Sequence, residues 1–340
     1  MKSWQIFSIK TENRRILFPA LVLLTLLCAG LSLCCGAVKL PLGDVIRSLF
    51  GRGDGAYTDS IVLYSRLPRT CGCLLAGAAL AVSGAVIQGV LHNPLAAPNI
   101  IGVNAGAGLA VALCGALIPL RAASFPLAAF LGAMLSMLLV LGIAERTGAS
   151  RLTLVLSGVI VSAVFSAGID AVLTFFPDAL NGYTDFRIGG MENLTMAKVA
   201  PAFWVILPSL IILLLLTNEL DLLLLGSDTA RSLGLSAKRL RVVFLALAAA
   251  LAGAAVSYAG LLGFVGLVVP HIMRLLVGEE SRPLMLSSLL GGAAFLTLCD
   301  LLARTLFAPY ELPVGIVLAF VGGPFFIWLL LKQRGGRTHD

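Results

Sequence analysis

Long apolar runs separated by short polar islands dominate this sequence, and they predict helices that span a membrane. Runs of roughly 18 or more apolar residues are long enough to cross a bilayer. We expect spans at residues 16–36, 66–91, 100–119, 122–144, 152–176, 199–217, 241–262, 284–306 and 312–331. A shorter apolar segment at 264–277 contains Pro270 and His271 and brings the expected total to about ten. The pattern therefore predicts an all-α, polytopic membrane protein.

A weak repetition in the pattern suggests two pseudo-repeated halves. Pro94 follows Ala81-Val-Ser-Gly84 at the same spacing at which Pro270 follows Ser257-Tyr-Ala-Gly260. Each set ends a glycine-rich span and enters an interrupted segment, an arrangement known from transporters built of two repeats. We expect residues 1–340 to form a single transmembrane domain. Its expected parts are a first span at 16–36, halves at 61–176 and 241–331, a linking span at 199–217 and a cytoplasmic coupling segment at 219–241.

Composition agrees with this picture, because 59% of the 340 residues are hydrophobic and only 12% are charged. A soluble domain carries about 25% charged residues. Much of the net charge of +7 lies at the two ends of the chain, so it does not indicate a nucleic-acid partner. Positive residues that flank spans favour the cytoplasmic side. With an even number of spans, both termini are expected in the cytoplasm.

One pair of positive residues breaks this charge rule. In the expected topology the basic island at 231–241 faces the cytoplasm, whereas Arg66 and Arg69 face outward. An outer arginine pair at the start of a glycine-rich span calls for a functional explanation. A polar break at Asn93-Pro94-Leu95 ends the same span, so this stretch looks like part of a passage rather than a simple anchor.

The sequence contains no recognisable catalytic, nucleotide-binding or metal-binding motif. No G-x-x-x-x-G-K-[ST] motif is present, so another subunit must bind ATP and Mg²⁺ if ATP drives the protein. No Ser, His and carboxylate set stands out, and no ligand spacing indicates a metal site. The seven cysteines lie mostly in apolar runs without a C-x-x-C pair, so they are interpreted as small buried hydrophobes. We expect neither an enzyme nor a bound cofactor.

Ionisable residues inside spans are costly and are candidates for function. Asp300 and Arg304 lie four residues apart on one helix face, where they either pair with each other or act on a substrate. Asp170 has no obvious local partner. Arg187 lies beside an outer loop that lines a possible entrance.

The polar island at 219–241 has the signals of a short cytoplasmic helix. Ser227 or Asp228 suits its start and Gly234 suits the position just past its end. Ala230 and Leu233 give it a small apolar face. It is either a handle for a cytoplasmic partner or an ordinary amphipathic loop.

At this point an ordered set of motifs resembles a known family, the FecCD-type permease subunits of type II ABC importers for ferric siderophores, haem and cobalamin. The resemblance covers about 61–334. Its motifs are Arg66-Leu-Pro-Arg69, Gly77 to Gly84 with Gln88, Asn93-Pro-Leu-Ala-Ala-Pro98, Gly102-Val-Asn104-Ala-Gly106, Leu225-Gly226 with Ala230-Arg231-Ser-Leu-Gly234, Gly263 to His271, Asp300-Leu-Leu-Ala-Arg304, Glu311 to Gly315 and Gly323 to Phe326.

The resemblance implies roles that the motifs alone do not give. It implies a permease embedded in membrane lipid that pairs with a second copy or a sister permease, two cytoplasmic ATPase subunits and an extracytoplasmic substrate-binding protein. Binding-protein docking falls on Arg66, Arg69 and Arg304. The inner gate falls on Asn93 and Leu95. ATPase coupling falls on Ser227, Asp228, Ala230, Arg231, Leu233 and Gly234, and the possible pathway residues are Gln88, Asn104, Asp170 and Arg187.

Other functions stay open on the sequence. An ion-coupled secondary transporter would use Asp170 and Asp300 as carriers, and a membrane scaffold or receptor would transport nothing. Asp170 and Arg187 also depart from the family's pattern, and either tunes selection of a charged cargo or pairs inside the bundle. The sequence does not name the cargo, for which a ferric siderophore is the first choice, ahead of haem and cobalamin.

Overall fold

The computed structural model describes residues 11–36, 38, 40–51, 56–118, 124–147, 151–226 and 232–334. These residues form helices joined by turns and loops. The elements are α1 (Thr11–Cys34), α2 (Leu42–Leu49), α3 (Ala56–Ile61), the π-helical turn η2 (Val62–Arg66), α4 (Leu67–Leu91), α5 (Val103–Leu117), α6 (Phe125–Arg146), α7 (Arg151–Phe175), α8 (Ala179–Ile188), α9 (Met196–Leu215), α10 (Thr217–Leu224), α12 (Ala237–Ala259), α13 (Val265–Val277), α14 (Ser281–Thr305) and α15 (Val314–Arg334).

The apolar runs become helices of the expected kind. Seven helical stretches are long and apolar enough to cross a membrane, and three shorter apolar helices fill three further predicted segments. Within the described residues no β-strand occurs, so the all-α prediction is confirmed. The total of ten spans stays a prediction, because length and composition alone do not place the shorter helices across a bilayer.

Short helices are the main feature that the apolar pattern did not predict. α2, α3, α8 and α10 have between 6 and 10 residues each and lie in or beside polar connections. Helices of that length are marginal by themselves, and tertiary packing rather than propensity stabilises them. The sequence predicted an outer loop in the segment that contains α8, and the structure corrects this to a helix with Tyr183 on its buried side.

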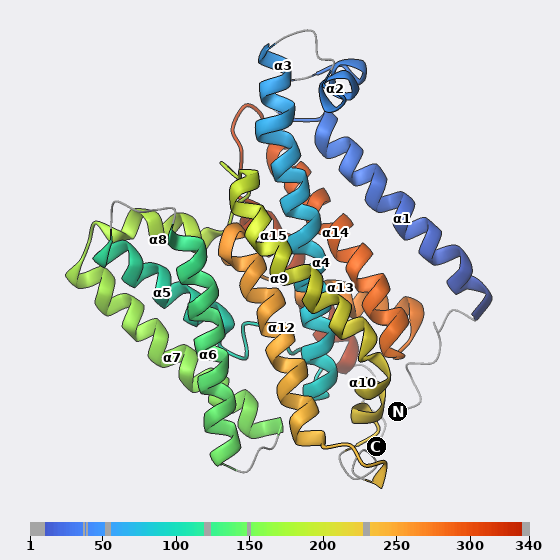
Figure 1. The fold of residues 1–340 in the computed structure, drawn as a ribbon, viewed down its shortest axis with the longest axis vertical. Coiled ribbons are helices and arrows are strands. Elements are labelled where there is room, and N and C mark those ends of the chain that lie inside the picture. Colours follow the sequence, from blue (N-terminus) through green and yellow to red (C-terminus); the bar gives the residue numbers. More distant parts are fainter. Residues whose placement is uncertain are drawn as a thin grey trace.

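α4 forms the centre of the molecule and packs against α12, α13 and α14 (Figure 1). Glycines allow this close packing. A Cβ added to Gly77 would lie 2.1 Å from the carbonyl oxygen of Gly292 in α14, and one added to Gly84 would lie 1.8 Å from that of Gly266 in α13. The backbones therefore touch where these glycines meet, as small residues permit between membrane helices.

A second group of helices stands beside this centre. α5, α6, α7 and α8 gather on one side of the molecule, joined to the centre mainly through α12, while α1 lies on the opposite side (Figure 1). Gly106 of α5 and Gly132 of α6 meet in the same manner as the central pairs, at 2.3 Å from an added Cβ to the facing carbonyl oxygen.

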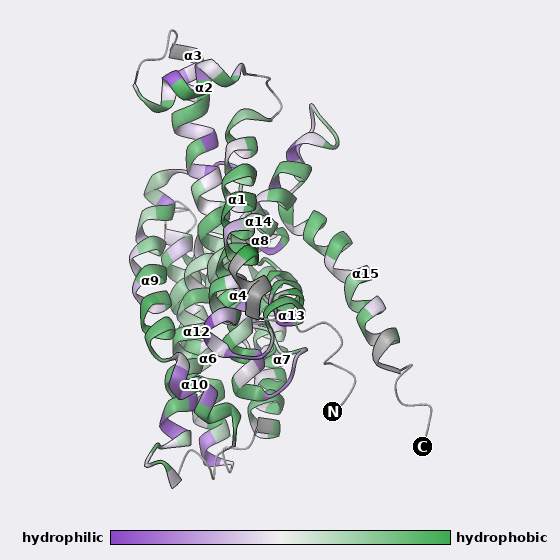
Figure 2. Cartoon of the chain, turned by 90° about the vertical axis from the view of Figure 1, so that its right-hand side faces the viewer, coloured by the Kyte–Doolittle hydropathy of each residue, from purple (hydrophilic) through white to green (hydrophobic). Residues whose placement is uncertain are grey.

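Much of the outer surface is apolar. Only 17% of the apolar stretch in α1 and 28% of the apolar stretch in α7 is buried inside the protein. Figure 2 shows hydrophobic residues along most of the helices, with hydrophilic ones concentrated near α3 and α10 at the two ends. α15 extends away from the other helices in the same view, beyond its contacts with α13 and α14.

The two suggested halves share an order of helix lengths. In the first, the 25-residue α4 precedes the 15-residue α5. In the second, the 23-residue α12 precedes the 13-residue α13. A pseudo-repeat would produce this arrangement.

Candidate functional site

Two polar clusters lie at opposite ends of the central helix α4. With 25 residues, α4 is about 37 Å long at about 1.5 Å per residue. Arg66 and Arg69 lie at its N-terminal end, and Gln88, His92 and Asn93 lie at its C-terminal end. Nearly every residue between them is buried. We call the first group the outer cluster and the second the inner cluster, following the expected topology.

The outer cluster contains a buried ion-pair network. Asp300, which has no exposed surface, lies 3.0 Å from Nε of Arg69 and 3.1 Å from Nε of Arg304. Arg69 reaches a second carboxylate with Nη1, which donates to Glu311 Oε2 at 2.6 Å. The pairing of Asp300 with Arg304, one of the two alternatives that the sequence left open, is therefore present, and Arg69 joins it from another helix. One carboxylate between two guanidinium groups satisfies charges that would be costly to bury alone.

The remaining arginine donors bind the end of α1. Arg66 Nη1 donates to the carbonyl oxygens of Leu33 at 2.8 Å and Cys34 at 2.7 Å, and its Nη2 donates to that of Val38. Arg304 Nη2 donates to the carbonyl and hydroxyl oxygens of Ser32, at 3.2 and 2.8 Å. The last carbonyl groups of a helix lack intrahelical partners and carry partial negative charge, so cations are stabilising there.

The three arginines expected to dock a binding protein are thus held inside the protein. Arg66, Arg69 and Arg304 are only 4%, 7% and 3% exposed. Glu311 is the accessible member of the network, with 30% of its side chain exposed. Glu311 lies within one of the family motifs, but the sequence indicated no role for it, because its partner Arg69 lies 242 residues away in the chain. Docking stays a prediction.

Glu192 lies near the outer cluster in the connection between α8 and α9. Burial raises the pKa of its carboxyl group above the ordinary value of 4.5, and Glu311, Asp185 and Asp300 add to the rise, while Arg69 opposes it. Glu192 is exposed in spite of these neighbours. Because its pKa is raised, the charged form of Glu192 is disfavoured beside the outer cluster.

The inner cluster begins where α4 ends in a left-handed turn. His92 has φ 49° and ψ 39°. The N–H of Asn93 donates to the carbonyl oxygen of Gln88 at 3.0 Å, and that of His92 donates to Gly89 at 2.9 Å. This pair of bonds is the Schellman motif, which usually has glycine at the left-handed position. Histidine is among the few other residues that adopt that conformation with some frequency.

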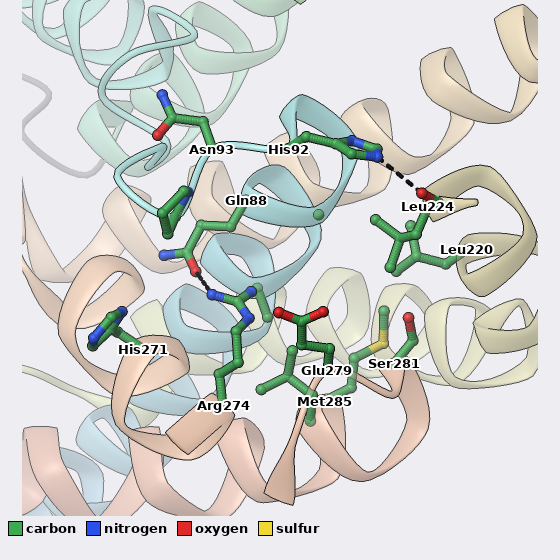
Figure 3. A pocket seen from close by; sticks show the side chains of 14 residues that line it. Gln88, His92, Asn93, Leu220, Leu224, His271, Arg274, Glu279, Ser281 and Met285 are labelled. Atoms are coloured by element: carbon green, nitrogen blue, oxygen red, sulfur yellow. Dashed lines mark hydrogen bonds between the residues drawn. The ribbon is translucent and has the colours of Figure 1, made fainter. Parts of the chain in front are cut away.

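Polar side chains then connect the end of α4 to its neighbours. Arg274 of α13 and Gln88 point toward one another in Figure 3, with Nη1 of Arg274 donating to Oε1 of Gln88 at 2.9 Å. The amide nitrogen of Gln88 donates to the carbonyl oxygen of Gly266 at 3.2 Å. His92 Nε2 lies 3.1 Å from the carbonyl oxygen of Leu224, the last residue of α10. Asn93 Oδ1 accepts a hydrogen bond from the N–H of Leu95 at 3.0 Å.

A cavity of about 380 Å³ opens beside this end of α4. Its polar wall includes Gln88, Arg274 and Glu279, and its apolar wall includes Leu224 and Met285 (Figure 3). Asn93 of the expected inner gate lines it, whereas Leu95 does not. Volumes of this order are within the range of small-molecule sites.

The other expected pathway residues lie away from both clusters. Asn104 on α5 donates to Asn99 Oδ1 at 2.6 Å. Asp170 on α7 and Arg187 on α8 are exposed. Each lies close enough to Tyr183 to act on it electrostatically, which places both on the side group of helices. The described residues show no interior bundle partner for Asp170 or Arg187, and their cargo role stays a prediction.

Only part of the expected coupling segment lies in the described region. Ser227, Asp228, Ala230 and Arg231 fall outside the described residues. Leu233 is 59% exposed, and Gly234 has φ +78°, the left-handed conformation expected past a helix end. The described part of 219–241 contains most of α10 and the start of α12, where Ser236 Oγ accepts the N–H of Arg239 at 3.4 Å.

Metal ligation has no support in the described residues. Among them, no group of three or more His, Cys, Asp or Glu side chains gathers at a distance that suits an ion. At the outer end of α4 the carboxylates are paired with arginines, and at the inner end an arginine and amides gather, which suit anions and hydrogen-bond acceptors.

Comparisons with known proteins cover nearly the whole chain. Residues 23–332 match the model of the FecCD transport family. The chain is 36% identical to the hemin transport system permease protein HmuU of Yersinia pestis, over 97% of this chain and 99% of that one. It is 38% identical to the Fe(3+) dicitrate transport system permease protein FecC of Escherichia coli, over 89% and 92% of the two chains.

A solved structure agrees with these relatives. The fold is similar to an inward-facing conformation of a metal-chelate type ABC transporter, with a TM-score of 0.83 and 30% sequence identity. The likeness covers 94% of this chain and 99% of that chain.

Proposed function

The chain belongs to the FecCD transport family and is a permease subunit of an ABC importer, and we propose that it forms the membrane pathway for an iron chelate or haem. The observation that carries the proposal is the family match along nearly the whole chain. Two relatives are named for hemin and for Fe(3+) dicitrate, which are iron compounds with carboxylate groups. Cobalamin stays a further expectation from the sequence.

We propose that ATP is bound and hydrolysed by two separate cytoplasmic subunits. The chain lacks a phosphate-binding glycine-rich loop with its lysine, which supports this division. The permease then contributes geometry and coupling. An extracytoplasmic binding protein delivers the cargo at the outer cluster, in a bacterial inner membrane with both termini in the cytoplasm.

A second permease copy, or a sister permease, completes the pathway in this proposal. α15 supports it, because this helix extends away from the other helices (Figure 2). It also carries large apolar side chains that are exposed. Phe320 is 76% exposed and Trp328 is 51% exposed. A partner helix or lipid covers such side chains in a membrane.

α10 is suited to transmit motion from the coupling segment to the inner gate. Most of α10 lies within that segment, and its last residue, Leu224, accepts the hydrogen bond of His92. Near its middle, Asp221 Oδ1 accepts the N–H of Ser281 at the start of α14 at 3.0 Å. A displacement of α10 therefore acts on the residue before Asn93 and on α14 together.

Ion coupling is the weaker alternative, and Asp300 supplies the reason. A carrier carboxylate must exchange its ion with water. Asp300 is fully buried between Arg69 and Arg304, within 3.1 Å of both. The relatives are ABC permeases as well.

Transport in proteoliposomes tests the proposal. The permease is reconstituted with its ATPase subunits and binding protein, and uptake of ferric citrate, a ferric siderophore and hemin is measured with internal ATP. We expect uptake of one of these compounds to require ATP and to stimulate ATP hydrolysis. Uptake that follows a proton or sodium gradient without ATPase subunits would refute it.

A further inference from the structure

The cavity beside the inner cluster contains a cation that lacks a carboxylate partner. Arg274 is half-buried, and its one hydrogen bond within the described residues goes to the neutral amide of Gln88 at 2.9 Å. A guanidinium group has five N–H donors. Within the part of the chain that the structure describes, no carboxylate lies within ion-pair distance of Arg274, although it interacts electrostatically with Glu279. The outer arginines are bonded far more fully.

The surroundings of Arg274 are suited to an anion with a carbon skeleton. The guanidinium group projects from α13 into the cavity beside Gln88, while Leu220, Leu284 and Met285 form an apolar wall (Figure 3). Ligand sites commonly combine an apolar lining with a few fixed polar groups. An arginine with free donors binds a carboxylate in a fork, with two parallel hydrogen bonds.

We propose that this cavity is a binding site for a small carboxylate anion, held by Arg274 with Gln88 as the group that positions the guanidinium. The acceptor of Gln88 takes one N–H of Arg274 and its own amide is fixed on Gly266, so the guanidinium plane is oriented before a ligand arrives. The carboxylate replaces water at the remaining donors, and its carbon atoms lie on the apolar wall.

Glu279 sets the strength of this site. It lines the cavity and is exposed at the turn between α13 and α14. Its negative charge attracts Arg274 and repels an incoming carboxylate, so binding is weak. Weak binding suits a place from which an anion leaves toward the cytoplasm. This link to release rests on the proposed function, in which the anion is the carboxylate arm of a chelate; a free metabolite has the same chemistry.

Binding of citrate to the full permease complex in nanodiscs tests the site. Isothermal titration with citrate alone is compared with ferric citrate, which distinguishes a free carboxylate from a chelate. We expect citrate to bind the wild type. Arg274→Gln should weaken citrate binding by about tenfold or more, since a hydrogen bond to a charged group contributes about 1.5–3 kcal/mol. Glu279→Gln should tighten it several-fold.

Arg282→Gln is the matched control, because it removes an exposed positive charge from the first turn of α14 without touching the cavity. Its citrate affinity should equal that of the wild type. Arg274→Lys keeps the charge but loses the fork, and we expect an intermediate affinity. Thermal unfolding without citrate shows whether each variant is folded.

Three results would overturn the proposal: unchanged citrate binding in folded Arg274→Gln or Arg274→Lys, weaker binding in Glu279→Gln, or equal displacement of citrate by inorganic phosphate or by chloride at the same ionic strength. The titration does not use transport. Failure of the uptake experiment with intact citrate binding would therefore remove the link to cargo and leave the site, whereas the reverse pair of results would remove the site alone.

Discussion

The two ends of α4 use arginine in opposite ways. At the outer end, Arg69 and Arg304 enclose Asp300, and the remaining donors of Arg66 and Arg304 hold the end of α1. At the inner end, Arg274 makes one hydrogen bond to the described part of the chain and faces a cavity of about 380 Å³. The outer arginines therefore act on the structure of the chain itself, while the inner arginine is free to act on something else.

Removing Asp300 should produce the largest effect and should break the outer network. Asp300→Ala leaves Arg69 and Arg304 buried without their shared carboxylate, which should destabilise the folded state by about 3–5 kcal/mol. Thermal unfolding in detergent and the yield of folded protein measure this loss. Asp170→Ala removes an exposed carboxylate and serves as the control. Equal stability of the two variants would contradict the account of the outer network.

The rigid connection between the two ends depends on glycine contacts. Gly77→Ala places a methyl group 2.1 Å from the carbonyl oxygen of Gly292, so α4 and α14 must separate. We expect a loss of about 1–3 kcal/mol from overpacking. Gly142→Ala, with nothing within 4 Å of the added Cβ, is the control and should be neutral or stabilising. A neutral Gly77→Ala would show that the helices adjust freely.

The left-handed end of α4 offers a way to separate conformation from side-chain contact. His92→Gly keeps the backbone conformation but loses the bond to Leu224, whereas His92→Ala loses the bond and keeps the strain. Left-handed backbone costs about 1–2 kcal/mol outside glycine, so the Gly variant should be the more stable. Both should lower uptake per ATP hydrolysed if His92 links α10 to the gate. Normal coupling in both variants would remove His92 from that role.

The smallest effect is expected at Glu192, beside the outer cluster. Its raised pKa means that folding disfavours the charged form above that pKa, and that the penalty vanishes as pH falls through it toward 4.5. Glu192→Gln should therefore stabilise the protein slightly at neutral pH and have no effect below pH 4.5. Thermal unfolding across this range measures the difference. A destabilising substitution at neutral pH would show that Glu192 instead forms a favourable pair with Arg69.

The sequence predicted the helices well because apolar length alone decides whether a run can cross a membrane. It also offered the pairing of Asp300 with Arg304 as one of two alternatives, since residues four apart lie on one helix face. It did not predict that Arg69 joins Asp300 and Glu311, because those partners lie 231 and 242 residues away. Such contacts depend on how α4 and α14 pack.

The sequence also indicated Asn93-Pro94-Leu95 as a break but not how the break is built. A Schellman motif usually has glycine at its left-handed position. Because His92 occupies that position here, the sequence did not indicate the motif. The sequence did not indicate the cavity either, for a different reason. Its walls come from α4, α10, α13 and α14, and no single stretch of sequence contains it.

The π-helical turn η2 has a consequence for how this protein can change. Residues Val62–Arg66 follow an i→i+5 pattern, so this turn holds one residue more than an α-helix would. Deleting Tyr64, whose side chain is 76% exposed, would close the turn into ordinary α-helix and leave α3 in nearly its present orientation, because the wider π turn already absorbs the additional residue. Arg66 and Arg69 would keep their positions on the α4 side. One residue can thus be lost at this turn while the outermost helices keep their direction and the buried charges beneath them keep their partners.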